Sequence, residues 1–236
     1  MKDTNTLFQH GTLALLVPGL LTGTIKIADF LKHGDTGIGT GEGLDGELII
    51  LDGVAYQIDG DGNVNELGDD FTVPFGNMHF ADYKPFKSVD NLDLAGMPEA
   101  VLGAKSLANA FFSIKLTGEF KTMKTRSVFK QSKPYPTLAE CSDKQHVFDG
   151  ENKKGTVLSY FSPQLFNGAA VGGFHSHFLA DDKSQGGHIL DFTGFTGKIE
   201  LQVFSNLDQQ LPIDNAEYMD HDFSKDDIEG AIEHAE

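Results

Sequence analysis

From residue 155 on, the chain is a succession of short apolar segments, each followed by residues that favour turns. In order, these segments read GTVLSYFSP, FNGAAVGGFHSHFLADD, GGHILDFTGFTG and KIELQVFSNLDQQLP. Short strands with turn signals at nearly regular spacing are typical of a small β-barrel or a β-sandwich. The 27 glycines of the 236-residue chain also favour a strand-rich protein over a helical bundle. We therefore expect the second half of the chain to be mostly β-structure.

The first half of the chain contains both helical and strand patterns. Apolar residues at i, i+3 and i+4 predict a helix over residues 24–33, and a second helix is expected over residues 97–111. At the far end of the chain, Ser224 with Asp227 three positions on resembles a capping box that opens a terminal helix. Helices of this kind, combined with the strands around them, predict the α+β class.

Two pairs of strands are expected in the first half. The segment ELIILDGVAYQID predicts a hairpin that turns at Asp52 and Gly53. The segment FFSIKLTGEFKTMKTRSVFKQ predicts a second pair of strands, which turns at Thr117 and Gly118. The first half would therefore combine helices with β-sheet.

A polar segment interrupts these patterns near the middle of the chain. The residues PYPTLAECSDKQHVFDGENKKG include Pro134 and Pro136 and separate the mixed first half from the strand-rich second half. We interpret this segment as the boundary between two domains, residues 1–133 and residues 134–236. The expected architecture is an α+β protein with an N-terminal mixed β-sheet domain that carries helices and a smaller C-terminal β-barrel-like domain.

Charge and cysteine content argue against several classes of function. The net charge of −17 argues against nucleic acid and anionic membrane as partners, because both require a cationic surface. The single cysteine, Cys141, cannot form an intrachain disulfide, and we interpret it as an inert thiol. No apolar run reaches the roughly 18 residues of a membrane-spanning helix. We interpret the apolar N-terminal run TLALLVPGLLTG as core rather than as a signal peptide, which predicts a cytoplasmic protein.

Three of the nine histidines fall in one glycine-rich stretch, GFHSHFLADDKSQGGHILDF. Residues i and i+2 of a strand project from one face, so His175 and His177 are expected to be neighbours. A turn over residues 179–187 would return His188 on the adjacent strand, opposite that pair. Three converging imidazoles form a set of nitrogen ligands that leaves coordination positions open, as in catalytic zinc sites.

The same spacing also fits buried histidines that bond to backbone carbonyls without a metal. Three adjacent imidazoles without a metal would need other partners when neutral and would repel each other when charged. The glycines on both sides of the motif let a ligand or another backbone segment approach closely. We therefore favour a metal site with zinc as the expected ion, although three histidines also suit iron, manganese, nickel or cobalt.

The histidine stretch, together with LKHGDTGIGTGEGLDGELIILDG near the front, resembles the acetolactate decarboxylase family. The resemblance runs from about Leu7 to Glu236. It implies a mixed-sheet α/β domain joined to a smaller β-barrel domain, a homodimer, and a metal bound by the three histidines of the motif. The chain departs from the family at Ser176, where an apolar residue is usual between the paired histidines, and we expect Ser176 to face away from the metal.

The resemblance also implies roles for residues that the pattern alone leaves open. Arg126, the only arginine, would by itself be interpreted as part of a surface ion pair, but it matches the family's substrate-binding arginine. A guanidinium fork suits a carboxylate better than the point charge of lysine does. Glu47 matches a carboxylate that contacts the metal or handles a proton, and Thr40 matches a substrate-binding residue of the same pocket. The Ala-Glu ending implies that Glu236, rather than Glu233, returns to the metal site.

The activity that the resemblance implies is removal of carbon dioxide from the small molecule 2-acetolactate, which gives acetoin in the butanediol pathway. The metal would chelate the hydroxyl and ketone oxygens and stabilise an enediolate, which is then protonated stereospecifically. Arg126 would orient the leaving carboxylate, and Glu47 or Glu236 would supply the proton. Two alternatives stay open: a hydrolase or hydratase with a metal on three histidines, and a non-enzymatic, metal-stabilised β-barrel that binds a ligand.

Overall fold

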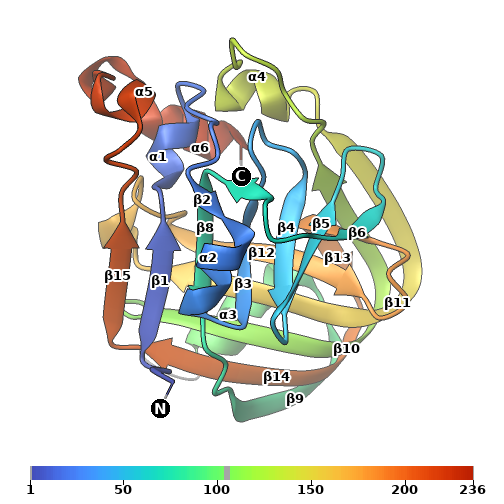
Figure 1. Ribbon diagram of the computed structural model, residues 1–236. Helices are drawn as coiled ribbons and strands as arrows, with labels where there is room; N and C mark the ends of the chain where they lie inside the picture. The colour runs from blue at the N-terminus through green and yellow to red at the C-terminus, as the bar shows by residue number, and fades with distance from the viewer. Residues whose placement is uncertain (1, 104–106, 236) are drawn as a thin grey trace.

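The computed structural model describes residues 2–103 and 107–235, and side chains in the last helix up to residue 232. Most of this chain forms two large β-sheets, and the helices are short and few (Figure 1). The protein is therefore β-rich within the predicted α+β class.

The first sheet has seven strands, in the order β15-β1-β8-β3-β4-β5-β6. β1 and β15 pair in parallel, and the other neighbours are antiparallel, so this sheet is mixed. The predicted hairpin between β4 and β5 is confirmed, and Asp52 and Gly53 at its turn both have positive φ angles, as a type I′ turn requires. The strands are β1 (Thr6–His10), β3 (Thr36–Thr40), β4 (Glu47–Leu51), β5 (Val54–Ile58), β6 (Val64–Glu66), β8 (Phe75–His79) and β15 (Asn206–Gln210).

The second sheet has six strands, in the order β11-β12-β13-β10-β14-β9. β10 also pairs with β11, so β10, β11, β12 and β13 form a closed ring of antiparallel strands. The strands are β9 (Lys84–Leu92), β10 (Phe111–Ser127), β11 (His146–Ser162), β12 (Gly173–Ala180), β13 (Gly186–Thr193) and β14 (Phe195–Phe204). A separate small sheet pairs β2 (Ile25–Lys26) with β7 (Thr72–Val73).

β10 is one continuous strand, and the prediction of two strands with a turn at Thr117 and Gly118 is wrong. Gly118 faces Gly155 of β11 and Gly197 of β14, so three glycines lie side by side across the sheet. A Cβ atom at Gly118 would come 2.3 Å from a backbone oxygen of β14. Glycine at this position therefore permits close approach of neighbouring strands, which the sequence alone does not distinguish from a turn.

The helices are short, and two of the predicted ones need correction. The helix predicted over residues 24–33 begins only at Ile27, because the two residues before it pair in β2. The helix predicted over residues 97–111 ends at Leu102, and the rest of that prediction covers residues 104–106, outside the described part, and the approach to β10. The helices are α1 (Leu13–Leu16), α2 (Ile27–Phe30), η1 (Leu31–His33), η2 (Leu94–Gly96), α3 (Met97–Leu102), α4 (Leu138–Ser142), η3 (Gln164–Phe166), α5 (Ala216–Met219), η4 (Phe223–Lys225) and α6 (Ile228–Ala235), where η marks 3-10 helices.

The predicted terminal helix is α6, but its capping residue differs from the prediction. The Asp227 carboxylate accepts a hydrogen bond from the backbone N–H of Gly230 at 3.2 Å, so Asp227 caps the helix. Ser224 lies in the preceding turn, η4, and does not cap α6. Within the described residues, none of the helices is long and apolar enough to cross a lipid bilayer.

The polar segment that follows residue 133 contains regular structure. It forms α4, whose first turn is closed by a capping box between Thr137 and Glu140, and the beginning of β11. β15, from the end of the chain, lies in the first sheet, whereas β9 and β10, from the first half, lie in the second. The predicted boundary therefore does not coincide with the boundary between the two sheets.

The two sheets pack against each other, with their strands running across one another (Figure 1). One buried cluster joins them, and it includes Ile38 and Ile49 of the first sheet together with Leu158 and Leu179 of the second. β4 lies against β12 and β13, the strands that carry the histidine motif. At one end of the first sheet α6 packs against α1 and α4. The histidine motif therefore lies between the sheets and close to this group of helices.

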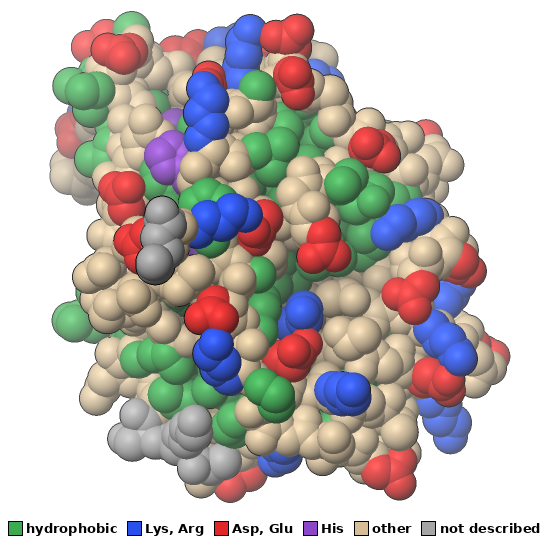
Figure 2. Space-filling model, turned by 60° about the horizontal axis from the view of Figure 1, so that its bottom comes forward, with side chains coloured by type: hydrophobic (Ala, Val, Ile, Leu, Met, Phe, Trp, Pro, Cys, Tyr) green, Lys and Arg blue, Asp and Glu red, His purple; other side chains and the backbone are tan. Residues whose placement is uncertain are grey.

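Acidic and basic side chains are interspersed on the face of the molecule that Figure 2 shows. On the face in Figure 2, the described Lys side chains are scattered among Asp and Glu side chains, with apolar side chains between them. The net charge of −17 is thus not the property of one acidic patch on this face.

Candidate metal centre and active site

Three histidine side chains meet where β12 and β13 face β4. His177 and His188 are directly opposite each other on the paired strands, and His175 lies two residues earlier on the same face as His177. The nitrogens that could bind a metal all lie within 4.8 Å of one another. The period of the strand and the register of the pair thus bring together the three rings of the motif.

All three imidazoles are held in the neutral form by burial. Burial, and next the positive charge of Arg126, lowers the pKa of His175 to about 3. Burial likewise lowers the pKa values of His177 and His188 far below the ordinary value for histidine. Neutral imidazoles carry the lone pairs that metal ions bind, so this cluster suits a cation without any loss of protons.

His177 provides the sharpest indication that a cation fits here. Its Nδ1 donates a hydrogen bond to the backbone oxygen of Leu48 at 2.7 Å, which leaves the lone pair on Nε2. Nε2 is buried, makes no hydrogen bond within the described residues, and lies 3.4 Å from Glu47 Oε2. Two acceptors that face each other repel unless a cation or a proton lies between them. The donor set therefore fits a metal bound by nitrogen, with Glu47 either next to it or protonated.

Ser176, between the paired histidines, projects to the opposite side of β12. Its hydroxyl bonds to the hydroxyl of Ser159 on β11 at 2.6 Å. Both side chains are buried, so each hydroxyl has its partner inside the core. Ser176 thus faces away from the histidines, as the strand period predicts.

Arg126 lies beside the histidines because of strand pairing. It is opposite His188 across β10 and β13, so the two side chains share one face. Its side chain is buried, and Nη1 donates a hydrogen bond to Gln145 Oε1 at 3.0 Å. Gly187, the neighbour of His188, has a φ of +119°, and a Cβ there would come 2.4 Å from the Arg126 backbone oxygen. Only glycine fits this close approach without strain.

Thr40 and Glu47 come from paired positions at the ends of two adjacent strands. Thr40 ends β3, Glu47 begins β4, and the two residues are opposite each other. The Thr40 hydroxyl donates to the backbone oxygen of Gly46 at 2.8 Å, so it supports the turn while its oxygen can still accept. Both residues line the same pocket as Arg126.

The family resemblance predicts that Glu236, rather than Glu233, returns to the metal site. Glu236, and the side chain of Glu233, lie outside the described residues. The part of α6 that is described packs against α1 and α4, and Ile232 is buried in one cluster with Leu13 and Leu138. The helix that carries the chain end is therefore fixed beside the pocket.

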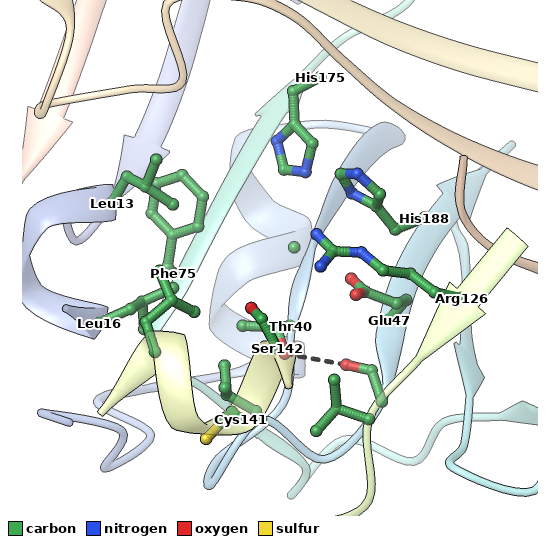
Figure 3. A pocket seen from close by; sticks show the side chains of 15 residues that line it. Leu13, Leu16, Thr40, Glu47, Phe75, Arg126, Cys141, Ser142, His175 and His188 are labelled. Carbon is green, nitrogen blue, oxygen red and sulfur yellow. Dashed lines mark hydrogen bonds between the residues drawn. The ribbon is translucent and has the colours of Figure 1, made fainter. Parts of the chain in front are cut away.

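The pocket has one polar and one apolar side. Figure 3 shows His175, His188, Arg126 and Glu47 on one side of the pocket. The opposite side is apolar and is built largely by α1, α4 and the strand end that carries Phe75. The apolar side chains are Leu13, Leu16, Leu44, Phe75, Val128 and Leu138. Such a pocket suits a small ligand with an anionic group at one end and alkyl groups at the other.

Several lining residues were not expected from the sequence. Leu13 and Leu16 come from the apolar N-terminal run, which indeed forms core but also lines the pocket. Cys141 and Ser142 of α4 reach the same pocket from the polar segment. Burial raises the pKa of the Cys141 thiol to about 11, so the thiol stays protonated near neutral pH. The amphipathic pattern of α4 is the one signal that marks these residues in advance.

His175, His188, a guanidinium and a carboxylate line one half-apolar pocket, and His177 lies beside the other two imidazoles. This arrangement defines a candidate metalloenzyme that acts on a small anion. The family model described as alpha-acetolactate decarboxylase matches residues 7–225 of the chain. The chain therefore belongs to the alpha-acetolactate decarboxylase family and is an enzyme of the carboxy-lyase class. The family resemblance of the two sequence motifs is confirmed.

Relatives are similar over the whole chain. The alpha-acetolactate decarboxylase of Lactococcus lactis subsp. cremoris is 37% identical over 240 residues, which cover all of both chains. That of Streptococcus thermophilus is 34% identical and again covers all of both chains. The crystal structure of alpha-acetolactate decarboxylase from Bacillus subtilis strain 168 superposes with a TM-score of 0.92 at 29% identity, covering 98% of this chain and 99% of that chain.

Proposed function

We propose that this enzyme converts 2-acetolactate to acetoin and carbon dioxide with a divalent metal held by His175, His177 and His188. The observation that carries the proposal is the pairing of buried neutral imidazoles with a buried guanidinium in one pocket. The substrate has a carboxylate, a hydroxyl and a ketone on adjacent carbons, together with two methyl groups. Its polar atoms match the polar side of the pocket, and its methyl groups match the apolar side.

The metal would be held by the three histidine nitrogens, with Glu47 next to it. When bound, a divalent metal supplies a Lewis acid that attracts the negative charge developing on the hydroxyl and ketone oxygens of the substrate. Three neutral ligands leave the full charge of the ion available for this purpose. Zinc is the ion that we propose, because histidine nitrogens in a three-ligand site are typical of catalytic zinc.

Arg126 binds and orients the substrate carboxylate in this proposal. The bond between the carboxylate carbon and the hydroxyl-bearing carbon breaks, carbon dioxide leaves, and the electron pair moves into the ketone to give an enediolate. Cleavage is fastest when this bond is perpendicular to the plane of the ketone, and a guanidinium that grips both carboxylate oxygens can hold that geometry. Burial of Arg126 strengthens the grip, because water does not compete for the same N–H groups.

A carboxylic acid then donates one proton to the hydroxyl-bearing carbon, which gives acetoin. Glu47 is one candidate, since a proton on it would also relieve the repulsion with His177 Nε2. Glu236 is the other candidate, implied by the family resemblance. Delivery from one fixed side of the pocket makes the product stereospecific. Thr40 would accept a hydrogen bond from the substrate hydroxyl.

The experiment that tests this proposal is an acetoin-forming assay before and after metal removal. Chelation should abolish acetoin formation, and added zinc or another divalent metal should restore it. Full turnover by protein that elemental analysis finds free of metal would disprove the metal role. Metal-dependent hydrolysis of esters without any acetoin would favour the hydrolase alternative instead.

We also propose that the protein forms a homodimer, on the basis of the family resemblance. Sedimentation equilibrium would measure the mass of the assembly.

We propose that the protein is located in the cytoplasm. Fractionation of the source cells would test this location.

A further inference from the structure

Gln145 holds one end of the Arg126 side chain. It lies in the short segment between α4 and β11, where its backbone N–H donates to the Ser142 oxygen at 3.1 Å. Its side-chain oxygen accepts the hydrogen bond from Arg126 Nη1 at 3.0 Å. Gln145 is half-buried, whereas Arg126 is 7% exposed. The amide thus reaches inward from near the surface to a buried guanidinium.

The other edge of the guanidinium carries a buried donor, Nε, that has no partner among the described residues. A guanidinium has five N–H groups in one plane, and its Nε and Nη2 share the edge that lies away from Nη1. Arg126 Nε is buried and makes no hydrogen bond with any residue that the structure describes. Buried donors without a partner are rare in folded proteins, so such a donor in a pocket indicates a ligand. Two parallel N–H groups on one edge match the two oxygens of a carboxylate.

The chemical type of the residue at position 145 matters as much as its position. The chain has 35 acidic and 18 basic residues, so an acidic partner for its only arginine would be unremarkable. A carboxylate at this position would orient Arg126 as well as an amide does, but it would neutralise the guanidinium and repel an incoming anion. An amide orients the guanidinium and leaves its charge intact.

We propose that Gln145 is a positioning residue that fixes Arg126 with its Nε–Nη2 edge towards the pocket. It thereby gives the pocket its preference for a carboxylate over a neutral ligand of the same shape. The identity of the natural ligand in this inference rests on the proposed function. The preference of the pocket for a carboxylate can be measured without turnover.

The test compares a carboxylate with its neutral isostere on the metal-loaded protein. The probes are 2-hydroxy-2-methylpropanoate and 2-hydroxy-2-methylpropanamide, and calorimetry measures the Kd of each. The variants are Gln145→Ala, which removes the acceptor, and Gln145→Glu, which keeps an acceptor but adds a negative charge. The matched control is Gln131→Glu, because the Gln131 side chain is bonded to its own segment, at the Phe129 oxygen. Acetoin formation gives kcat and KM for the same four proteins.

Gln145→Ala should weaken binding of the carboxylate about tenfold, with the amide nearly unaffected, and should raise KM about tenfold with little change in kcat. Gln145→Glu should weaken carboxylate binding further. The Tm of this variant should not be lower than that of the wild type. Gln131→Glu should change neither Kd. The inference is overturned if Gln145→Glu binds the carboxylate as tightly as the wild type, or if Gln145→Ala weakens both probes equally.

The same measurements separate this inference from the proposed function. If the wild type forms no acetoin but the Gln145 variants lose their preference for the carboxylate, the positioning role holds and the proposed reaction fails. If the wild type forms acetoin and the Gln145 variants keep both their KM and their carboxylate preference, the positioning role fails alone.

Discussion

Single atoms decide how the metal centre can work. The Nε2 atom of His177 and the Oε2 atom of Glu47 are 3.4 Å apart, and the backbone of Leu48 fixes the orientation of the imidazole. One hydrogen bond to the main chain thus selects which nitrogen of His177 faces Glu47. A ring held this way loses little freedom when it binds an ion, so the protein provides its ligand already oriented.

Replacing Arg126 by lysine should harm catalysis far more than folding. Lysine retains the positive charge, but it cannot present two parallel N–H groups to a carboxylate or reach Gln145 in the same geometry. We expect kcat/KM for acetoin formation to fall by about 100-fold. Urea denaturation should show a free energy of unfolding within about 1 kcal/mol of the wild type. Wild-type kinetics would instead make Arg126 a structural residue.

At the scale of secondary-structure elements, the pocket depends on contacts between segments that are far apart in the chain. The sequence predicts strands and the meeting of His175 with His188, because a strand repeats every two residues and a hairpin fixes its own register. It does not predict that Leu13 and Leu138 share a cluster with Ile232, because those contacts join helices far apart in the chain. The contact of Gln145 with Arg126 is not predicted for the same reason, because Gln145 lies between α4 and β11 whereas Arg126 lies on β10.

Gly187 of β13 should not tolerate a side chain. The variant Gly187→Ala would strain a φ of +119° and push a Cβ to 2.4 Å from the Arg126 oxygen on β10. We expect a loss of about 3 kcal/mol in the free energy of unfolding, together with a lower metal content, because His188 is the next residue. The control Gly68→Ala meets nothing within 4 Å and should stay within about 0.5 kcal/mol. Equal stability and metal content in both variants would contradict this expectation.

Glu236, which follows α6 in the sequence, is expected to contribute to turnover rather than to metal binding. Deleting Ala235 and Glu236 removes one of the two candidate acids but leaves Ile232 in its cluster with α1 and α4. A lost proton donor costs on the order of 100-fold in kcat, so acetoin formation should fall by that amount while the metal content stays near that of the wild type. The matched control Glu229→Ala removes an exposed acid from α6 and should leave kcat unchanged. Undiminished turnover after the deletion would exclude a role for Glu236.

At the scale of the whole molecule, buried histidines couple stability to pH. His79, which is not one of the proposed metal ligands, is fully buried, and its Nδ1 is hydrogen-bonded to the Tyr160 hydroxyl at 2.8 Å. Burial lowers the pKa of His79 to about 3, from 6.5 in an exposed histidine. In the unfolded chain His79 therefore takes up a proton below about pH 6.5, whereas in the folded protein it stays neutral until near pH 3. The stability that the neutral ring confers is present above that window and is lost as the pH falls through it.

Urea denaturation at pH 7 and pH 5 measures this coupling. We expect His79 to account for about 2 kcal/mol of the loss in unfolding free energy between the two values. The variant His79→Gln, whatever its stability at pH 7, should lose less on acidification than the wild type by that amount. An identical loss in both proteins would exclude His79 from the pH dependence.

The parallel pairing of β1 with β15 joins residues 6–10 to residues 206–210. A ribosome that has completed residues 1–200 has therefore not yet made the strand that covers the outer side of β1. Until that strand arrives, β1 offers unsatisfied backbone groups to any neighbouring nascent chain, a known route to aggregation. Synthesis of residues 206–210 is thus the event that gives β1 its partner on this side, and a nascent chain that stops before them leaves these backbone groups unpaired.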